Sequence, residues 1–257
     1  MPMTDLFSLK GRTALVTGGS RGIGRMIAKG FLTQGARVYI SSRKAAACDD
    51  TVRELSALGP CFSLPADVST VEGARALAAA YGAKEGSLDI LVNNAGAAWG
   101  ESFDTFPEKG WDKVMDLNVK SPFFLTQAFH ELLRKGGTSQ PAKVINVASI
   151  DGVSVNPMET YSYAASKGGL IHLTKRMSLR LVQDNIVVSG IAPGAFASEM
   201  NRDARDHGDQ VAKRIPAGRI GSDEDMAGVA IYLASRAGDY VVGQTIVVDG
   251  GVTLARG

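Results

Sequence analysis

Short apolar runs alternate with amphipathic helical patterns along almost the whole chain, and this order limits the possible folds most strongly. The strand-like runs lie at residues 13–18, 37–42, 61–67, 88–96, 143–149, 185–193 and 244–251. The helical patterns lie between them, at residues 22–36, 46–59, 70–85, 107–117, 119–135, 160–183 and 222–235. Because strands that alternate with helices form βαβ units, the order predicts a parallel sheet with helices on both faces.

The composition of the strands supports this fold class. Residues 90–92 and 144–147 are nearly continuous apolar runs, which is typical of parallel strands buried on both faces. A length of 257 residues suits one large α/β domain better than two small ones, and no internal repeat or linker interrupts the pattern. We therefore expect a single doubly wound, Rossmann-type α/β domain over residues 1–257.

The charge balance argues against several classes of partner. Charged residues make up 21% of the chain and the formal net charge is +2, so neither nucleic acid nor a membrane is an expected partner. Only Cys48 and Cys61 are present, without metal-type spacing, and we expect two reduced thiols and no metal. Residues 1–12 lack an apolar signal core, and no apolar run reaches the ~18 residues of a spanning helix, which favours a cytoplasmic location.

The segment TGGSRGIG, residues 17–24, joins the first strand to the first helix. Its glycines let the backbone approach a pyrophosphate, and the helix N-terminus behind them supplies free N–H groups and a positive dipole. A tight turn without a ligand is the alternative, but the position after the first strand of a βαβ unit favours a dinucleotide site. The residues predicted to bind the cofactor here are Gly18, Ser20, Arg21, Gly22, Ile23 and Gly24.

The end of the second strand indicates which cofactor is preferred. Dinucleotide folds that select NAD place Asp or Glu there to hold the ribose 2′-hydroxyl. This chain has Ser42 and Arg43 instead, and Arg43 together with Arg21 can clamp a 2′-phosphate. The alternative is a pair of solvated surface arginines. We expect NADP(H) rather than NAD(H), bound in part by Ser42 and Arg43.

Two further strand ends lie at the same edge of the predicted sheet, the carboxyl edge where open α/β sheets bind ligands. Asp67 ends the third strand, where its carboxylate can accept a hydrogen bond from the adenine amino group. The alternative is that Asp67 caps the helix expected at 70–85. The residues expected to contact the cofactor at these two strand ends are Asp67, Val68, Asn94, Ala95 and Gly96.

The segment YSYAASK, residues 161–167, offers two tyrosines to one lysine. Each residue of a helix turns by about 100°, so Tyr163 and Lys167 share a face, whereas Tyr161 points elsewhere. A neighbouring ammonium lowers the pKa of a phenol from about 10, so that Tyr163 can act as general acid toward a carbonyl oxygen. Ser149, at the end of the fifth strand, can polarise the same oxygen. The alternative is an ordinary pair of side chains on a helix surface.

These motifs, in this order and at these spacings, resemble the short-chain dehydrogenase/reductase family. The resemblance rests on TGGSRGIG, NNAG, Asn118 in LNVKS, Ser149, YAASK, PG and VDGG, and it runs from about residue 9 to residue 252. It implies one doubly wound domain with a seven-stranded parallel sheet, and a catalytic tetrad of Asn118, Ser149, Tyr163 and Lys167. In such a tetrad Asn118 positions a proton relay that reaches Lys167, and Lys167 also holds the nicotinamide ribose.

The resemblance also implies contacts at the nicotinamide end of the cofactor and an oligomeric state. The residues implied to contact that end are Pro193, Gly194, Phe196 and Ser198, besides Tyr163 and Lys167. Members of the family are commonly tetramers that pack through the helices expected here at 119–135 and 160–183. We therefore expect a homotetramer.

Longer phrases indicate the substrate class. GARVYISSR, ACDDTVRELSALG, NNAGAAWGESF and GWDKVMDLNV are similar to NADPH-dependent 3-oxoacyl-thioester reductases of the rhamnolipid-associated type. The expected reaction is hydride transfer to the ketone of a 3-oxoacyl thioester, giving the 3-hydroxy product. A sugar, polyol or steroid-like carbonyl is the alternative substrate, and a non-catalytic NADP(H)-sensing regulator is the alternative of another class.

Two local features leave alternatives open. Asp151 follows the serine strand, where the family usually has a small residue, and it either alters the substrate mouth or caps the following helix. The highly charged segment 199–214 is either a substrate lid or a solvated helix face.

Overall fold

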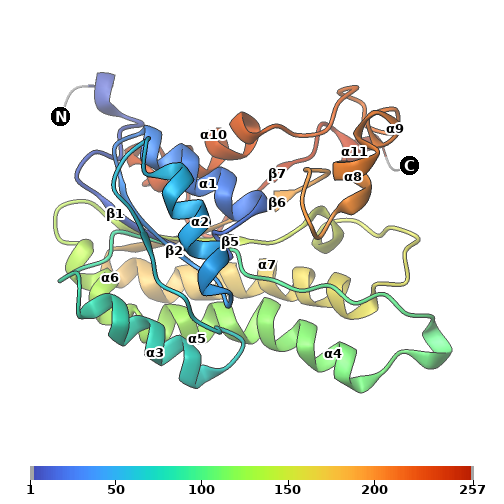
Figure 1. The fold of residues 1–257 in the computed structure, drawn as a ribbon, viewed down its shortest axis with the longest axis horizontal. Helices are drawn as coiled ribbons and strands as arrows, with labels where there is room; N and C mark the ends of the chain where they lie inside the picture. The colour runs from blue at the N-terminus through green and yellow to red at the C-terminus, as the bar shows by residue number, and fades with distance from the viewer. Residues whose placement is uncertain (1–2, 256–257) are drawn as a thin grey trace.

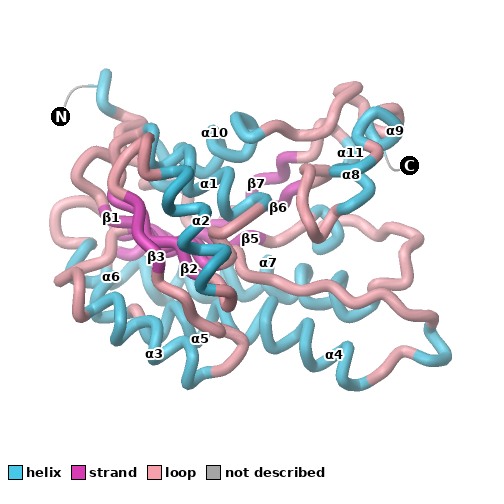
Figure 2. Tube along the Cα trace, viewed as in Figure 1, coloured by secondary structure: helices cyan, strands magenta, loops and turns pink. Residues whose placement is uncertain are grey.

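A seven-stranded parallel sheet runs through the centre of the molecule (Figures 1 and 2). The computed structural model describes residues 3–255, and the strand order is β3-β2-β1-β4-β5-β6-β7. The strands are β1 Thr13–Thr17, β2 Arg37–Ser41, β3 Cys61–Ser63, β4 Ile90–Asn93, β5 Ala142–Val147, β6 Ile186–Pro193 and β7 Thr245–Val248. This sheet confirms the predicted fold class. The domain limits of 1 and 257 stay a prediction, since residues 1–2 and 256–257 lie outside the described residues.

Helices cover both faces of the sheet, as the alternation predicts. One layer, at the top of Figure 1, consists of α1 Gly22–Thr33, α2 Ala45–Leu55 and α10 Asp223–Ala234. The layer at the bottom consists of α3 Val71–Gly82, α4 Glu108–Met115, α5 Ser121–Ala128, α6 His130–Gly136 and α7 Tyr161–Leu181. Three short helices complete the fold, α8 Arg202–Asp206, α9 Gly208–Ala212 and α11 Val252–Ala255. No helix within residues 3–255 is long and apolar enough to cross a membrane.

Alternating side chains of the strands separate two hydrophobic cores. On β1, Val16 packs with Phe31 of α1 in the core under α1 and α10. Its neighbour Leu15 packs with Leu77 of α3 in the core on the opposite face. All four side chains are at least 99% buried. Since burial of one large apolar side chain contributes about 1.5–3 kcal/mol, the two cores fix the register of the sheet.

Two predicted elements have different limits in the structure, and a proline accounts for one of the differences. The third strand is predicted to run to residue 67, but β3 ends at Ser63, although the N–H groups of Leu64 and Ala66 still donate to the end of β2 at 2.9 and 3.1 Å. The helix predicted at 119–135 is divided into α5 and α6 at Phe129, and it begins with a π-helical segment, Asp116–Lys120. Pro122 cannot donate to the carbonyl of Asn118, its partner in an α-helix, so the hydrogen-bond ladder changes register here.

The strand order reverses between β1 and β4. Strands β2 and β3 lie on one side of this point and β5, β6 and β7 on the other. The chain segments that leave β1 and β4 therefore diverge at the carboxyl edge, and the gap between them is the usual ligand site of open α/β sheets. The predicted glycine turn follows β1 and the NNAG segment ends β4, so both lie at this point.

Candidate active site

The glycine turn between β1 and α1 has a backbone that requires glycine at several positions. Gly18 and Gly22 have positive φ angles of +65° and +51°. A Cβ atom on Gly24 would lie 2.3 Å from the carbonyl oxygen of Gly18, so no larger residue fits. Helix α1 starts at Gly22 without a side-chain cap, which leaves its first N–H groups for a ligand. This cradle fits a pyrophosphate group.

Thr17 and Gly19, which are not among the predicted cofactor contacts, help Asn94 to hold the turn in place. The Thr17 hydroxyl donates to the Val92 carbonyl (3.1 Å) and accepts hydrogen bonds from the backbone N–H groups of Asn94 (3.0 Å) and Ala95 (3.2 Å). The Asn94 side chain donates to the Thr17 carbonyl at 2.9 Å, so it braces the turn itself. Gly19 is also fixed, because a Cβ atom there would lie 2.8 Å from Ile40.

The two arginines predicted to select the cofactor lie on adjacent loops. The N–H of Gly19 donates to the carbonyl of Ser41 at 3.2 Å, which ties the glycine turn to the end of β2. Arg21 and Arg43, on either side of this bond, are both exposed. The Ser42 hydroxyl lies between them in sequence and is 3.0 Å from the Cys48 thiol. Two cations and a hydroxyl at this place suit a phosphate monoester.

Asp67 does not cap the helix that follows it. Helix α3 is capped by Thr70, whose hydroxyl accepts a hydrogen bond from the N–H of Gly73 at 3.0 Å. The Asp67 carboxylate accepts only a local hydrogen bond from the N–H of Ser69 (3.0 Å) and is exposed at the sheet edge. Val68 beside it is buried. The carboxylate is therefore available to a ligand, as the first of the two alternatives requires.

The reactive side chains meet where β5 ends and α7 begins. Ser149 follows β5, and its side chain is close enough to Tyr163 to lower the pKa of the phenol in part. Lys167, one turn further along α7, has its Nζ 5.5 Å from the centre of the Tyr163 ring. This ammonium donates a 2.8 Å hydrogen bond to the Val147 carbonyl. Tyr163 and Lys167 thus share one face of α7, as their spacing predicts. This face is turned toward Ser149.

Tyr161 lies on a different face of α7. Its ring is 38% exposed and packs edge-on against Phe103 and Phe106, with centroid distances of 5.7 and 5.8 Å. Its hydroxyl donates to the Glu159 carboxylate at 3.2 Å. The hydroxyl of Tyr161 therefore belongs to a surface aromatic cluster and that of Tyr163 to the site.

The predicted direction of the Tyr163 pKa shift is wrong for this structure. Burial raises the pKa of Tyr163 to about 12, the nearby Ser149 side chain lowers it in part, and the charge of Asp151 raises it further. The ammonium of Lys167 points to a backbone carbonyl and does not offset the burial. Burial also lowers the pKa of Lys167 to about 8, against a raising effect of Asp151. Tyr163 is thus a protonated phenol at neutral pH, the form that donates a proton.

Asn118 joins the β4 end to α7. Its amide oxygen accepts a hydrogen bond from the N–H of Ala97 (2.8 Å), and its nitrogen donates to the Ala97 carbonyl and the Ser166 hydroxyl, both at 2.9 Å. A Cβ atom on Gly96 would lie 3.2 Å from the Asn118 oxygen and 3.8 Å from Lys167 Nζ. All four residues of the predicted tetrad are therefore brought to one place. Both N–H groups of the Asn118 side chain are engaged, so the proton relay would involve its backbone.

A network of buried polar side chains links the strands and the helix that carry the predicted tetrad. The Asn93 amide donates to Asn146 at 2.8 Å, and the Asn146 amide donates to Thr174 at 2.9 Å, which links β4, β5 and α7. All three residues are at least 97% buried. The sequence shows an asparagine in each of β4 and β5, but it does not show which residues these asparagines contact.

The segment after β6 lies across the glycine turn. The N–H of Gly194 donates to the Val248 carbonyl at 2.9 Å, and a Cβ atom on Gly22 would be 3.0 Å from Ser198. Pro193 and Gly194 are therefore held at the carboxyl edge. Phe196 is only 2% exposed and packs on Gly221, so any ligand contact of Phe196 would come from its backbone.

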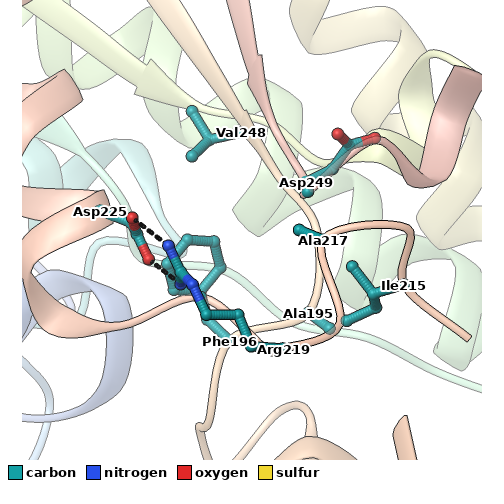
Figure 3. A pocket seen from close by; sticks show the side chains of 10 residues that line it. Ala195, Phe196, Ile215, Ala217, Arg219, Asp225, Val248 and Asp249 are labelled. Atoms are coloured by element: carbon teal, nitrogen blue, oxygen red, sulfur yellow. Dashed lines mark hydrogen bonds and ion pairs between the residues drawn. The ribbon is translucent and has the colours of Figure 1, made fainter. Parts of the chain in front are cut away.

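The Phe196 side chain lines a separate cavity of about 150 Å³ (Figure 3). Arg219 and Asp225 form a two-point ion pair on its wall, at 2.5 and 3.0 Å. The remaining labelled lining residues are Ala195, Ile215, Ala217, Val248 and Asp249. Arg219 and Asp225 are paired with each other, and the Asp249 carboxylate accepts hydrogen bonds from the N–H groups of Gly251 and Thr253 at 2.8 and 2.7 Å. This cavity therefore differs in character from the catalytic group.

The charged segment 199–214 folds into α8 and α9. Arg205 forms ion pairs with Glu199 and Asp206, and Asn201 caps α8 through a 3.1 Å hydrogen bond from the N–H of Ala204. Several of its charges are thus neutralised within the segment. Of the histidines, His130 pairs with Asp184 at 3.0 Å, and the described residues contain no cluster of His, Cys, Asp or Glu that would hold a metal.

The chain is similar over its whole length to known oxidoreductases. A family model described as enoyl-(acyl carrier protein) reductase matches residues 18–253. The chain is 48% identical over 256 residues to the rhamnolipids biosynthesis 3-oxoacyl-(acyl-carrier-protein) reductase of Pseudomonas aeruginosa, covering 98% of this chain and 100% of that protein. It is 38% identical over 261 residues to gluconate 5-dehydrogenase of Gluconobacter oxydans, covering 99% and 100%.

A solved structure shows the same arrangement of the whole chain. The Pseudomonas aeruginosa RhlG/NADP active-site complex superposes with a TM-score of 0.94 at 47% identity, covering 98% of this chain and 100% of that one.

Proposed function

Because the chain belongs to the short-chain dehydrogenase/reductase family of oxidoreductases, we propose that it reduces the ketone of a 3-oxoacyl thioester to the 3-hydroxy product. Its cofactor is NADP(H). The observation that carries the reaction type is the convergence of Ser149, Tyr163 and Lys167 beside the glycine turn. The substrate class is supported by the 48% identity to a 3-oxoacyl reductase over the full chain.

The residues present fit NADPH along the whole carboxyl edge. The glycine turn and the start of α1 would hold the pyrophosphate, since glycine is required there and the first helical N–H groups have no cap. Arg21, Ser42 and Arg43 would hold the 2′-phosphate, and Asp67 the adenine. Bound NADPH supplies the hydride.

The remaining steps are performed by side chains of this chain. The Ser149 oxygen accepts a hydrogen bond from the N–H of Asp151 (3.1 Å), which orients the hydroxyl and leaves its own proton to polarise the substrate carbonyl. Tyr163 donates its proton to the same oxygen. The Lys167 charge then stabilises the phenolate that remains, because the ammonium lies 5.5 Å from the centre of the ring.

The rate of reduction should depend on the charge of Lys167. The pKa of Tyr163 is raised to about 12, so the phenol stays protonated over the working range, whereas the pKa of Lys167 is lowered to about 8. Lys167 is therefore charged below pH 8 and loses its charge as the pH rises through that value. We expect kcat/KM for an uncharged ketone to be level below about pH 8 and to fall about tenfold per pH unit above it. A profile level up to pH 10 would contradict this assignment.

Replacement of Arg43 tests the 2′-phosphate site. We expect Arg43→Ala to raise the KM for NADPH by about 10- to 100-fold and to leave the KM for NADH within about threefold, because NADH has no phosphate to pair with the guanidinium. The control is Arg53→Ala, which removes an exposed arginine of α2 that pairs with Asp50. A wild-type enzyme with equal or higher kcat/KM for NADH would refute the predicted preference.

A sugar acid is the second candidate substrate, since the chain is also 38% identical to a gluconate 5-dehydrogenase. The two are separated by one screen, in which the oxidation of NADPH is followed by absorbance with 3-oxobutanoyl thioesters, 5-ketogluconate and neutral sugar ketones. Turnover with a thioester supports the proposal, and turnover with 5-ketogluconate alone refutes it. Cofactor binding without turnover on any ketone would favour a sensing role.

The homotetramer stays a prediction. A Cβ atom on Gly169 of α7 would meet only Val119 at 3.8 Å, an ordinary contact, so nothing within the described chain requires glycine at this place. A glycine costs about 1 kcal/mol in a helix. Close packing of α7 on another copy would account for it.

A further inference from the structure

Asp151 lies immediately beside the catalytic group. It follows Ser149 in a short 3₁₀ turn, Ile150–Gly152, and its N–H donates to the Ser149 hydroxyl oxygen at 3.1 Å. Its carboxylate accepts a 2.6 Å hydrogen bond from the side chain of Asn156. Helix α7 begins ten residues later, at Tyr161, without a side-chain cap, so the alternative of Asp151 as its cap is wrong.

The charge of this carboxylate is not neutralised by a cation at contact distance. Within residues 3–255, no ion pair includes Asp151, and the amide that holds it is uncharged. Asp151 is the one acidic side chain of the described residues whose charge raises the pKa of both Tyr163 and Lys167. The Asp151 carboxylate thus places a fixed negative charge close to Tyr163 and Lys167.

Most of the exposed side chains on the loop that carries Asp151 are apolar. Val153, Val155 and Met158 are exposed by 51%, 90% and 68%, and Glu159 at the end of the loop adds an exposed carboxylate. An uncharged, partly apolar substrate can approach across such a surface, and Asp151 is the acidic residue of this loop whose backbone contacts the Ser149 hydroxyl.

We propose that Asp151 determines specificity as a charge filter, which disfavours ketones with a carboxylate near the reacting carbonyl and admits uncharged ketones such as thioesters. The inference rests on the proposed ketone reduction. It distinguishes the two candidate substrates, because a thioester has lost the carboxylate charge of the free 3-oxo acid and a sugar acid retains it. Two like charges within one Debye length repel by an amount that corresponds to about tenfold in kcat/KM.

The test compares two substrates that differ in one charge. Ethyl 3-oxobutanoate and 3-oxobutanoate have the same ketone, and the ester is uncharged. We expect wild type to prefer the ester and Asp151→Asn to reduce the ratio of the ester kcat/KM to the acid kcat/KM about tenfold. Both substrates are reduced with the help of Tyr163 and Lys167, so an altered pKa of these groups affects both kcat/KM values and cancels in their ratio. Loss of the Asp151 charge affects only the charged substrate and does not cancel.

The matched control is Glu131→Gln, which removes an exposed carboxylate on α6, before the start of β5 and away from the carboxyl edge. It should leave the ratio unchanged. An unchanged ratio in Asp151→Asn, or a wild type that reduces the acid as efficiently as the ester, would overturn the filter. If the enzyme reduces only a neutral ketone that is neither ester nor thioester, the proposed substrate is wrong. The filter is then tested with the ratio of kcat/KM for that ketone to kcat/KM for its carboxylate analogue.

A second measurement needs no variant. Raising the ionic strength from about 20 mM to about 500 mM shortens the Debye length severalfold. In wild type, kcat/KM for 3-oxobutanoate should then rise relative to that for the ester. An equal effect of salt on both substrates would contradict the filter even if Asp151→Asn did not fold.

Discussion

Replacement of Tyr163 with phenylalanine is expected to lower kcat for ketone reduction by about 10³-fold while the affinity for NADPH changes by less than about threefold. The substitution removes one oxygen, which is the proton donor to the substrate carbonyl. The pKa of Tyr163 is raised to about 12, so this oxygen carries its proton at every working pH. Steady-state turnover and NADPH binding by fluorescence, measured on the same preparation, separate the two effects.

The matched control is Tyr161→Phe in the same helix. It removes the hydroxyl that donates to Glu159 at the surface, and the packing of the ring against Phe103 and Phe106 is retained. We expect kcat within about twofold of wild type. If Tyr161→Phe abolished turnover and Tyr163→Phe did not, the assignment of the proton donor would be wrong.

Replacement of Gly24 with alanine is expected to lower kcat/KM with NADPH by about 10²-fold and the free energy of unfolding by about 1–3 kcal/mol. The added Cβ would lie 2.3 Å from the Gly18 carbonyl oxygen and 2.5 Å from the Asn94 side chain. The carbonyl is backbone, so the turn itself must move, and the cradle for the pyrophosphate moves with it. Denaturant unfolding and NADPH kinetics measure the two losses.

A glycine-to-alanine substitution in another helix should raise the free energy of unfolding instead of lowering it. Gly228 lies in α10, is exposed, and has no atom within 4 Å of an added Cβ. Because alanine is favoured over glycine in a helix by about 0.8–1 kcal/mol, Gly228→Ala should stabilise the protein. If Gly24→Ala stabilised the protein as Gly228→Ala does, the expected clash of the added Cβ in the glycine turn would be contradicted.

Much of the fold follows from the alternation of apolar and amphipathic segments, because all seven strands are short and most are buried on both faces. The failures are local. Pro122 changes the helical register at Asn118, and this signal is present in the sequence as a residue without an N–H. The break at Phe129 has no such signal, since it depends on how its fully buried ring packs between α3 and the sheet.

The residues of the candidate site could be predicted where their roles depend on their spacing along a single helix or strand. Tyr163 and Lys167 fall on one face of α7 by helical geometry alone. Thr17 and the Asn93–Asn146–Thr174 network depend on contacts between distant segments, which no local pattern reports. The direction of the Tyr163 pKa shift was wrong for a similar reason, because the degree of burial is a property of the packed molecule.

The bracing of the glycine turn by β4 also sets an order of events in biosynthesis. Thr17 and Asn94 are separated by 77 positions in the chain. At about 5–20 residues per second, a ribosome needs about 4 to 15 s to make that interval. During this time the nascent chain carries the phosphate cradle without the strand that braces it. The phosphate cradle is therefore made in the first tenth of synthesis and braced only when β4 has emerged, so that cofactor capture cannot guide the earliest folding of the chain.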